Sequence, residues 1–317
     1  MFHIRFALTV YSVSIFTIIY QKTKNKRKVL LLKKAIIIGS GPAGISAALY
    51  LQRSGKVEVT VISSGAGALE KAEKIENYYG FAEPLTGKQL YENGIKGAQR
   101  LGVKIIEEEV VDLTFDMDMK PVVGTDKGEY HADAVLIATG ASRKTLKIKG
   151  IQEHEGKGVS YCAVCDAFFY RNKKVCVIGS GEYALHEAQV LAQTSESVTI
   201  LTNGNKLTAD VPANISVIEK KLVSVDGENT VESVTFDDGE SQPFSGVFIA
   251  LGVAGSSELA RKVGAETENG RIKVNEKMET SIPGLYAAGD CTGGTLQVFK
   301  AVYEGSTAAL AMLKNFQ

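Results

Sequence analysis

Two stretches of the chain repeat one pattern of apolar and polar positions. The first starts at Lys33 and reads KKAIIIGSGPAGISAALYLQRSGKVEVTVISSG; the second starts at Lys173 and reads KKVCVIGSGEYALHEAQVLAQTSESVTILTNG. Each has a β-branched run, a G-x-G turn, a helical stretch with alanine on its packing face and a second β-branched run. That order predicts a strand, a helix and a parallel strand. A repeat of this length predicts two nucleotide-binding-type units.

An alternating segment follows each repeat. Residues 110–140 alternate apolar and polar side chains around Gly124 and Gly128, and residues 217–252 repeat the theme. Alternation with a period of two predicts antiparallel strands, and each segment closes on an apolar run that predicts a buried strand. Residues 282–316 predict one more strand and a closing helix. The pattern therefore predicts an α/β fold with two Rossmann-like three-layer ββα units.

The first 32 residues do not fit this pattern. Residues 6–20 form an apolar run of 15 residues, interrupted by Ser and Thr and followed by a basic tract. A helix of that length spans roughly 22 Å, short of the ~30 Å hydrocarbon core of a membrane. No small-residue cleavage site follows, which argues against a secretory signal peptide. Residues 1–32 are therefore an atypical extension. It is either upstream sequence translated in error, which we favour because the body needs nothing before Lys33, or a marginal membrane anchor.

The charge is uneven along the chain, although its formal total is zero. No Asp or Glu precedes Glu58, and setting aside the six basic residues before Leu31 leaves 30 basic against 36 acidic residues. A body without basic excess gives no indication of nucleic-acid binding. The chain has four cysteines, two of them in a C-x-x-C. That is too few for a disulfide framework and indicates a reducing compartment, the cytoplasm.

The first glycine-rich loop predicts a dinucleotide cofactor. Gly39, Gly41 and Gly44 form G-x-G-x-x-G between a predicted strand and a predicted helix. Glycines at these places permit a tight turn, close approach of a pyrophosphate and close packing of helix on strand. The helix N-terminus adds unpaired N–H groups. The sequences ATG at 138–140 and AAGD at 287–290 accompany the loop, which makes a purely structural turn a poor explanation.

The polar residues expected around this cofactor match only in part those of a usual dinucleotide site. Asp290 falls at the end of a predicted strand, where its carboxylate can accept a hydrogen bond from a sugar-chain hydroxyl. The second strand of such a unit often ends in an acid for the ribose hydroxyls, but here it ends in Ser63 and Ser64. Serine hydroxyl groups can also hydrogen-bond the ribose, although less strongly than a carboxylate does. We therefore expect a variant of the usual dinucleotide site.

A redox pair is predicted in SYCAVCDAFFY. Cys162 and Cys165 are three positions apart and can close into a small disulfide ring, and Asp166 can supply the proton donor or acceptor that thiol–disulfide exchange requires. The alternative, half of a zinc site, lacks two further ligands, so no metal is expected. Cys176 lies in a β-branched run and Cys291 lies far along the chain, and both are expected to pack in the interior.

These motifs together resemble one family, the low-molecular-weight flavin thioredoxin reductases. The resemblance rests on GSGPAG, KIENYYGF, ATGAS, CAVCD, GSGEYA and IPGLYAAGD in that order, and covers the chain from about Lys33 to its end. CAVCD is similar to the family's C-A-T-C-D, and ENYYGF to its E-N-x-P-G-F with Tyr79 in place of proline. The resemblance implies a split FAD-binding domain at 33–145 and 247–317. An NAD(P)-type domain that carries the C-x-x-C, residues 146–246, is inserted into it.

The resemblance also implies roles for matching residues. FAD reduces the disulfide, Cys165 faces the flavin, Cys162 attacks and exchanges with thioredoxin, and Asp166 is the acid/base. Asn77 and Gln297 are placed near the flavin, with Leu296 where the family has an arginine, and a homodimer is implied. The full set of residues expected to bind the cofactor is Gly39, Gly41, Pro42, Ala43, Gly44, Ser63, Ser64, Asn77, Ala138, Thr139, Gly140, Gly289, Asp290, Gln297 and Val298.

The second glycine-rich loop is expected to be degenerate. Members of the family that use NADPH carry H-R-R-x-x-x-R after the second β-branched run, but residues 199–210 here read TILTNGNKLTAD, with Lys206 as the one cation. Each lost charge-assisted contact to the 2′-phosphate costs roughly 1.5–3 kcal/mol, so NADPH should bind weakly. The altered loop comprises Gly179, Gly181, Glu182, Tyr183 and Ala184, and Glu182 is placed to occupy the anion site itself.

A branch of the family takes electrons from reduced ferredoxin instead of pyridine nucleotide, and this sequence resembles that branch most. Such partners are generally acidic, so basic residues at 142–150 and 171–174 are candidates for a docking patch. Three alternatives stay open: an NAD(P)H-dependent thioredoxin reductase, a flavin dithiol oxidase, and a non-enzymatic flavin-binding redox sensor. The intact C-x-x-C-D favours an enzyme.

Overall fold

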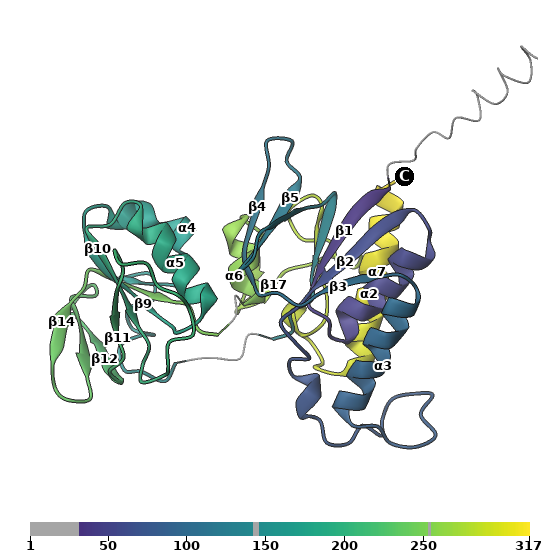
Figure 1. The fold of residues 1–317 in the computed structure, drawn as a ribbon, viewed down its shortest axis with the longest axis horizontal. Helices are drawn as coiled ribbons and strands as arrows, with labels where there is room; N and C mark the ends of the chain where they lie inside the picture. The colour runs from purple at the N-terminus through teal and green to yellow at the C-terminus, as the bar shows by residue number, and fades with distance from the viewer. Residues whose placement is uncertain (1–31, 142–145, 253–254) are drawn as a thin grey trace, which may run out of the picture. The chain divides into compact units, whose positions relative to one another are not determined.

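Two five-stranded parallel sheets organise the chain in the computed structural model, which describes residues 32–141, 146–252 and 255–317 (Figure 1). The apolar run at 6–20 and the rest of the extension up to residue 31 lie outside the described residues. Among the helices that are described, none has the length and apolar character needed to cross a membrane.

The first sheet has the strand order β18-β7-β1-β2-β3, with every neighbouring pair parallel. Apolar residues fill it because both of its faces are covered. Its strands are β1 (Lys33–Ile38), β2 (Val57–Ile62), β3 (Lys104–Ile106), β7 (Ala134–Ile137) and β18 (Leu285–Ala287).

Helices and a small antiparallel sheet belong to this first unit. Figure 1 shows the helices gathered beside β1, β2 and β3, and α2 packs along α7. Thr86 and Gln89 start α3 with a capping box, in which each side chain bonds the backbone N–H of the other residue. The elements are α2 (Pro42–Arg53), η1 (Leu69–Lys71), α3 (Gly87–Arg100), the antiparallel strands β4 (Val110–Phe115), β5 (Pro121–Thr125) and β6 (Glu129–His131), η3 (Asp290–Thr292) and α7 (Val298–Asn315).

The second sheet repeats this plan with the order β11-β10-β9-β15-β8, again parallel throughout. Its strands are β8 (Val159–Ser160), β9 (Lys174–Ile178), β10 (Ser197–Leu201), β11 (Ser216–Ile218) and β15 (Gly246–Ile249). The accompanying elements are α4 (Ala163–Asp166), η2 (Ala167–Tyr170), α5 (Glu182–Ala192) and the antiparallel strands β12 (Leu222–Asp226), β13 (Ser233–Phe236) and β14 (Ser241–Pro243).

All strands of the second sheet lie in sequence between β7 and β18 of the first, so the second unit is inserted into the first. The predicted fold class is confirmed. After the insertion the chain forms α6 (Ser256–Lys262), β16 (Thr267–Glu268) and β17 (Arg271–Ile272). The boundary that the sequence suggested at 247 cuts through the second sheet, because β15 pairs with β9 and β8. We therefore propose a boundary after Ile249.

The register of the first sheet explains why its polar loops meet. Ile38 pairs with Ile62 on one side and with Ile137 on the other, and Ile137 pairs with Ala287. The strands β1, β2, β7 and β18 therefore end at one level. Ligands of open parallel sheets bind at the carboxyl ends of the strands, so the loops that follow these four strands define where a site can form.

The crossing of α2 and α7 supplies a test of this packing. A Cβ at Gly305 of α7 would overlap the carbonyl oxygen of Ala43, whereas a Cβ at Gly97 of α3 would have no neighbour within 4 Å. We expect Gly305→Ala to lower the free energy of unfolding by about 1–3 kcal/mol through overpacking. Gly97→Ala should raise it by about 0.5–1 kcal/mol, since alanine favours the helix. Urea denaturation of the two variants measures both changes, and equal effects would contradict the close helix contact.

Candidate active site

The first glycine-rich loop connects β1 to α2 and is tight at two of its glycines. Gly39 has a φ of +107°, and a Cβ there would overlap the carbonyl oxygen of Ala138. A Cβ at Gly44 would overlap the carbonyl oxygen of Gly39, whereas Gly41 has nothing within 4 Å of its Cβ position. The loop thus packs closely on its inner side and leaves open space at Gly41, at the start of α2, as the approach of a pyrophosphate requires.

This loop borders a cavity of about 580 Å³, within the range of cofactor sites. The cavity is lined by all the residues predicted to bind the cofactor except Gly44, which packs beneath the loop. The buried hydroxyl of Thr139, also in the lining, has no hydrogen-bond partner among the described residues. An open backbone cradle and an unpaired buried hydroxyl fit a dinucleotide with its phosphates and sugar groups.

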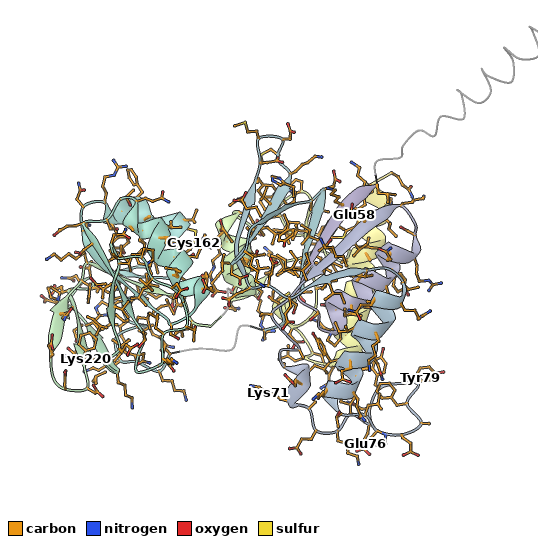
Figure 2. All side chains as sticks on the ribbon, viewed as in Figure 1. Glu58, Lys71, Glu76, Tyr79, Cys162 and Lys220 are labelled. Atoms are coloured by element: carbon orange, nitrogen blue, oxygen red, sulfur yellow. A yellow bond between two sulfur atoms is a disulfide. The ribbon has the colours of Figure 1, made fainter. Side chains whose placement is uncertain are left out.

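Two side chains placed by the resemblance meet in this cavity. The Asn77 side-chain amide donates a hydrogen bond to Gln297 Oε1 at 3.2 Å, although the two residues are 220 positions apart. Leu296, which stands where the family has an arginine, also lines the cavity. Tyr79, the residue in place of the family's proline, is fully exposed (Figure 2).

Sequence reasoning missed an acid in the cavity. Glu108 follows β3, the neighbour of β2, and lines the cavity together with Ser63 and Ser64. It accepts hydrogen bonds from the Tyr130 hydroxyl at 3.0 Å and from Thr125 Oγ1 at 2.7 Å. A carboxylate is therefore present in the cavity, but it follows the next strand instead of β2. Its position at the carboxyl end of a parallel strand was the signal that could have found it.

The turn that carries Asp290 is fixed by a pair of charges on α7. Glu304 accepts hydrogen bonds from the Gly289 N–H at 2.8 Å and from Thr292 Oγ1 at 2.9 Å. Lys300 donates to the Gly289 carbonyl at 2.8 Å and pairs with Glu304 at 2.9 Å. The start of α7 and the turn before η3 are thereby held together on one side of the cavity.

The two remaining cysteines are interior residues, as predicted. Burial raises the pKa of Cys291 to about 12, and its thiol lies 3.2 Å from the carbonyl oxygen of Ala288. Burial also raises the pKa of Cys176, which lies in β9. Neither thiol forms the reactive thiolate at neutral pH.

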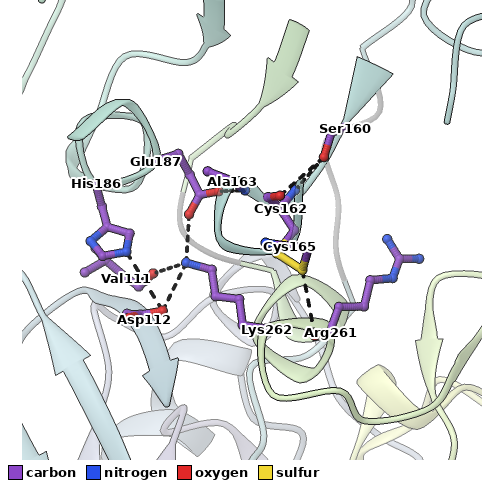
Figure 3. A network of polar contacts seen from close by, with 10 residues as sticks. All are labelled: Val111, Asp112, Ser160, Cys162, Ala163, Cys165, His186, Glu187, Arg261 and Lys262. Carbon is purple, nitrogen blue, oxygen red and sulfur yellow. Dashed lines mark hydrogen bonds and ion pairs between the residues drawn. A yellow bond between two sulfur atoms is a disulfide. The ribbon is translucent and has the colours of Figure 1, made fainter. Parts of the chain in front are cut away.

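The C-x-x-C is closed as a disulfide between Cys162 and Cys165. Cys162 caps the start of α4 and is 5% exposed, whereas Cys165 is exposed and its sulfur lies 3.9 Å from the carbonyl oxygen of Arg261 in α6 (Figure 3). Neither cysteine is among the residues that line the cavity. Helix α6 contacts both the disulfide and the cavity, because Arg261 lies next to Cys165 and Leu259 of the same helix lines the cavity.

Asp166 is positioned at the other end of α4. Its carboxylate accepts a hydrogen bond from Ser160 Oγ at 2.6 Å, and Ser160 Oγ in turn accepts the N–H of Cys162 at 3.1 Å. The Ser160 hydroxyl therefore bridges the Asp166 carboxylate and the backbone N–H of Cys162. Among the described residues, no group of three or more His, Cys, Asp or Glu side chains is arranged to hold a metal ion.

The second glycine-rich loop keeps its backbone but not its surroundings. A Cβ at Gly179 would overlap the Ala250 carbonyl oxygen, so the turn remains tight. Tyr183 is buried, with its ring beneath the Lys262 ammonium, so it packs into the interior. Asn203, at the end of β10, accepts the N–H of Leu222 with its side chain, and Thr208 donates hydrogen bonds to Ser180 of the loop.

Carboxylates gather at this loop, where a dinucleotide phosphate would sit. Burial raises the pKa of Glu109 to about 7, the Tyr183 backbone N–H opposes that rise by a hydrogen bond, and the charges of Asp126 and Glu182 add to it. Burial, Asp126 and Asp210 also raise the pKa of Glu182. Glu109 thus joins Glu182 near the start of α5, and the prediction that Glu182 occupies the anion site stays a prediction.

Comparisons with known proteins show the family to which the chain belongs. Residues 33–305 match the pyridine nucleotide-disulphide oxidoreductase family. A thioredoxin reductase of Aquifex aeolicus is 35% identical over 297 residues, which cover 88% of this chain and 92% of that protein. A thioredoxin reductase of Bacillus subtilis is 34% identical and covers 86% of this chain and 92% of its own length.

Solved structures give the same result. The atypical thioredoxin reductase TRi from Desulfovibrio vulgaris Hildenborough superposes with a TM-score of 0.84 at 36% identity, covering 89% of this chain and 97% of that one. A ferredoxin-flavin thioredoxin reductase from Clostridium acetobutylicum has a TM-score of 0.68 at 33% identity, covering 90% and 98% of the two chains.

Family, fold and redox motif therefore agree. Thioredoxin reductases of this family are FAD flavoproteins, and the cavity at the first glycine loop has the cradle that such a cofactor needs. The disulfide in α4 supplies the second redox centre. The chain belongs to the pyridine nucleotide-disulphide oxidoreductase family and is a FAD-dependent disulfide oxidoreductase of the thioredoxin reductase type.

Proposed function

We propose that this protein reduces the disulfide of thioredoxin and that it takes its electrons from reduced ferredoxin rather than from NADPH or NADH. The observation that carries the choice of donor is the crowding of carboxylates at the second glycine loop. Glu182 opens α5, where the phosphates of a pyridine nucleotide would need positive charge. Asp126 is close enough to raise the pKa of both Glu109 and Glu182, and Asp210 adds to the rise at Glu182. The absence of arginine from residues 199–210 adds to this.

One structural relative supports the same donor. The protein from Clostridium acetobutylicum is named a ferredoxin-flavin thioredoxin reductase, and it covers 90% of this chain at 33% identity. Bound FAD accepts electrons singly or in pairs and so can link an iron–sulfur protein to a disulfide. The residues that would hold it are those of the cavity, with Gly41 and the start of α2 at the pyrophosphate and Asp290 and Glu108 at hydroxyl groups.

The exchange step belongs to the residues of α4. The Cys162–Cys165 bond breaks as the pair takes up two electrons. One sulfur of the reduced pair then attacks the disulfide of thioredoxin, forming a mixed disulfide and releasing the other thioredoxin sulfur. The second sulfur of the pair attacks the mixed disulfide, which restores the Cys162–Cys165 bond and leaves thioredoxin with two thiols. Asp166, held by Ser160, is placed to move a proton during this exchange.

The surface next to the disulfide fits a folded protein as the substrate. Phe168 and Phe169 of η2 are 73% and 66% exposed, directly after α4. Large exposed aromatic side chains are typical of protein-binding surfaces. The Arg171 guanidinium lies 5.6 Å from the centre of the Phe168 ring, so part of the basic group at 171–174 adjoins this surface. We also propose a cytoplasmic homodimer, on the family resemblance and the cysteine usage alone.

The donor is tested anaerobically with the oxidised holoenzyme. We expect reduced ferredoxin to bleach the flavin and to support reduction of thioredoxin, and NADPH and NADH at micromolar concentration to do neither within the same time. Absorbance of the flavin and alkylation of thioredoxin thiols measure the two events. Rapid bleaching by NADPH would overturn the donor, and peroxide formation from a small dithiol and oxygen would indicate a dithiol oxidase.

The order of the two cysteines is tested by trapping. We assign the attack on thioredoxin to Cys162, which is buried here and must become accessible for this step, and the resolving attack to Cys165. The variant Cys165→Ser should then accumulate a mixed disulfide with thioredoxin, whereas Cys162→Ser should accumulate little. Non-reducing electrophoresis measures the adduct. Accumulation with Cys162→Ser instead would assign the attack to the exposed Cys165.

The crowded carboxylates predict a pH-dependent stability. The pKa of Glu109 is raised from 4.5 to about 7, so the folded protein holds this proton more tightly than the unfolded chain does. The resulting destabilisation grows as pH rises from about 4.5 to about 7 and is then constant. We expect Glu109→Gln to raise the melting temperature at pH 8 and to change it little at pH 5. The exposed Glu129→Gln is the control, and a gain that is equal at both pH values would refute the charge effect.

A further inference from the structure

The side chain of Lys262 is fully buried near the redox helix α4. Lys262 ends α6, and its side chain is 0% exposed. Its ammonium pairs with Glu187 Oε1 at 2.7 Å and with Asp112 Oδ1 at 3.2 Å, and it donates to the Val111 carbonyl at 3.1 Å (Figure 3). All three N–H donors thus have partners. Burying a charge is costly unless it is paired in this way.

Glu187 connects this lysine to the C-x-x-C. Its side chain is 2% exposed, and its second oxygen accepts the backbone N–H of Ala163 at 2.6 Å. Ala163 directly follows Cys162 and opens α4. A single carboxylate therefore bridges the Lys262 ammonium and the backbone next to the redox sulfur. Figure 3 shows Glu187 between Lys262 and Ala163.

The charges at this place bear on the reduced state of the pair. Reduction can place negative charge on Cys162, and the N–H of Cys165, 3.2 Å from Cys162 Sγ, can stabilise it. The carboxylate of Glu187 opposes that charge, and the Lys262 ammonium offsets the carboxylate. Burial and the charge of Lys262 lower the pKa of His186, so at neutral pH the lysine is the cation that faces Glu187 and Asp112.

We propose that Lys262 and Glu187 are positioning residues that set the reduction potential of the Cys162–Cys165 couple. Lys262 neutralises the carboxylate that binds the start of α4, which makes the disulfide easier to reduce, and Glu187 limits this effect. The inference rests on the proposed redox role of the pair. It predicts the direction of each shift, because removing the Lys262 cation and removing the Glu187 anion must change the reduction potential in opposite directions.

The experiment equilibrates the holoenzyme with dithiothreitol buffers of stepped redox ratio, without thioredoxin or electron donor. Acid quenching, alkylation and mass spectrometry of the peptide with Cys162 and Cys165 give the fraction of disulfide. We expect Lys262→Met to make the disulfide about tenfold harder to reduce, which is about 30 mV for a two-electron couple. Glu187→Gln, which keeps an acceptor for Ala163, should make it easier to reduce by a similar factor. The double variant should lie near the wild type.

A matched control comes from an exposed pair on the second unit. Lys220 pairs with Asp238 at 2.7 Å and also contacts Glu240 (Figure 2). The variant Lys220→Met removes the same charge far from α4 in the chain and should leave the equilibrium unchanged. If Lys262→Met does not fold, Glu187→Gln and the double variant still show in which direction each charge shifts the equilibrium between disulfide and dithiol.

The outcomes separate this inference from the proposed function. Shifts in the same direction for Lys262→Met and Glu187→Gln, or shifts no larger than that of Lys220→Met, would overturn it. Retention of FAD and the circular dichroism spectrum show that each variant is folded. If the wild-type pair exchanges with dithiothreitol but never with thioredoxin, the proposed substrate fails and the role of Lys262 stands.

Discussion

The Lys262 ammonium is a buried charge at the end of α6 whose partners come from β4 and α5. It binds β4 through Val111 and Asp112 and binds α5 through Glu187, and the same carboxylate holds the first amide of α4. Such a buried pair contributes little net stability compared with apolar packing, but loss of one partner leaves a charge unpaired. The contact therefore specifies one arrangement of these elements more than it stabilises the fold.

The two glycine loops show how one backbone plan supports different chemistry. In both, close contacts at Gly39 and Gly179 make the turn, so the strand–turn–helix geometry is the same. The first loop borders a cavity that contains an unpaired hydroxyl, whereas the second is followed by Glu182, whose pKa is raised by burial and by nearby carboxylates. In the proposed function, charge near the helix start, rather than the shape of the turn, decides which of the two loops holds a phosphate.

The sequence was sufficient wherever the signal is local. The β-branched runs, the G-x-G turns and the alternating segments predicted the elements of both units along the chain, because each signal depends on residues close together. The order of the strands within each sheet was not predicted. The glycine loop, Ser63, Ser64, residues 138–140 and Asp290 were found from motifs that follow predicted strands, whereas Asn77 and Gln297 were found only from the family resemblance. Glu108 and Lys262 were missed because their roles come from contacts with residues 17 to 151 positions away. The boundary at 247 was displaced because β15 is apolar enough to fit either sheet, and strand pairing decides which.

The unequal exposure of the two redox sulfurs has a consequence for the resting protein. A thiol that attacks a disulfide must approach one sulfur directly and expel the other. In the oxidised form only Cys165 can be approached from solvent, and the sulfur expelled would be the enclosed Cys162. A small thiol such as glutathione therefore has one direction of entry: its attack forms a mixed disulfide with Cys165, and Cys162 leaves as the enclosed thiol.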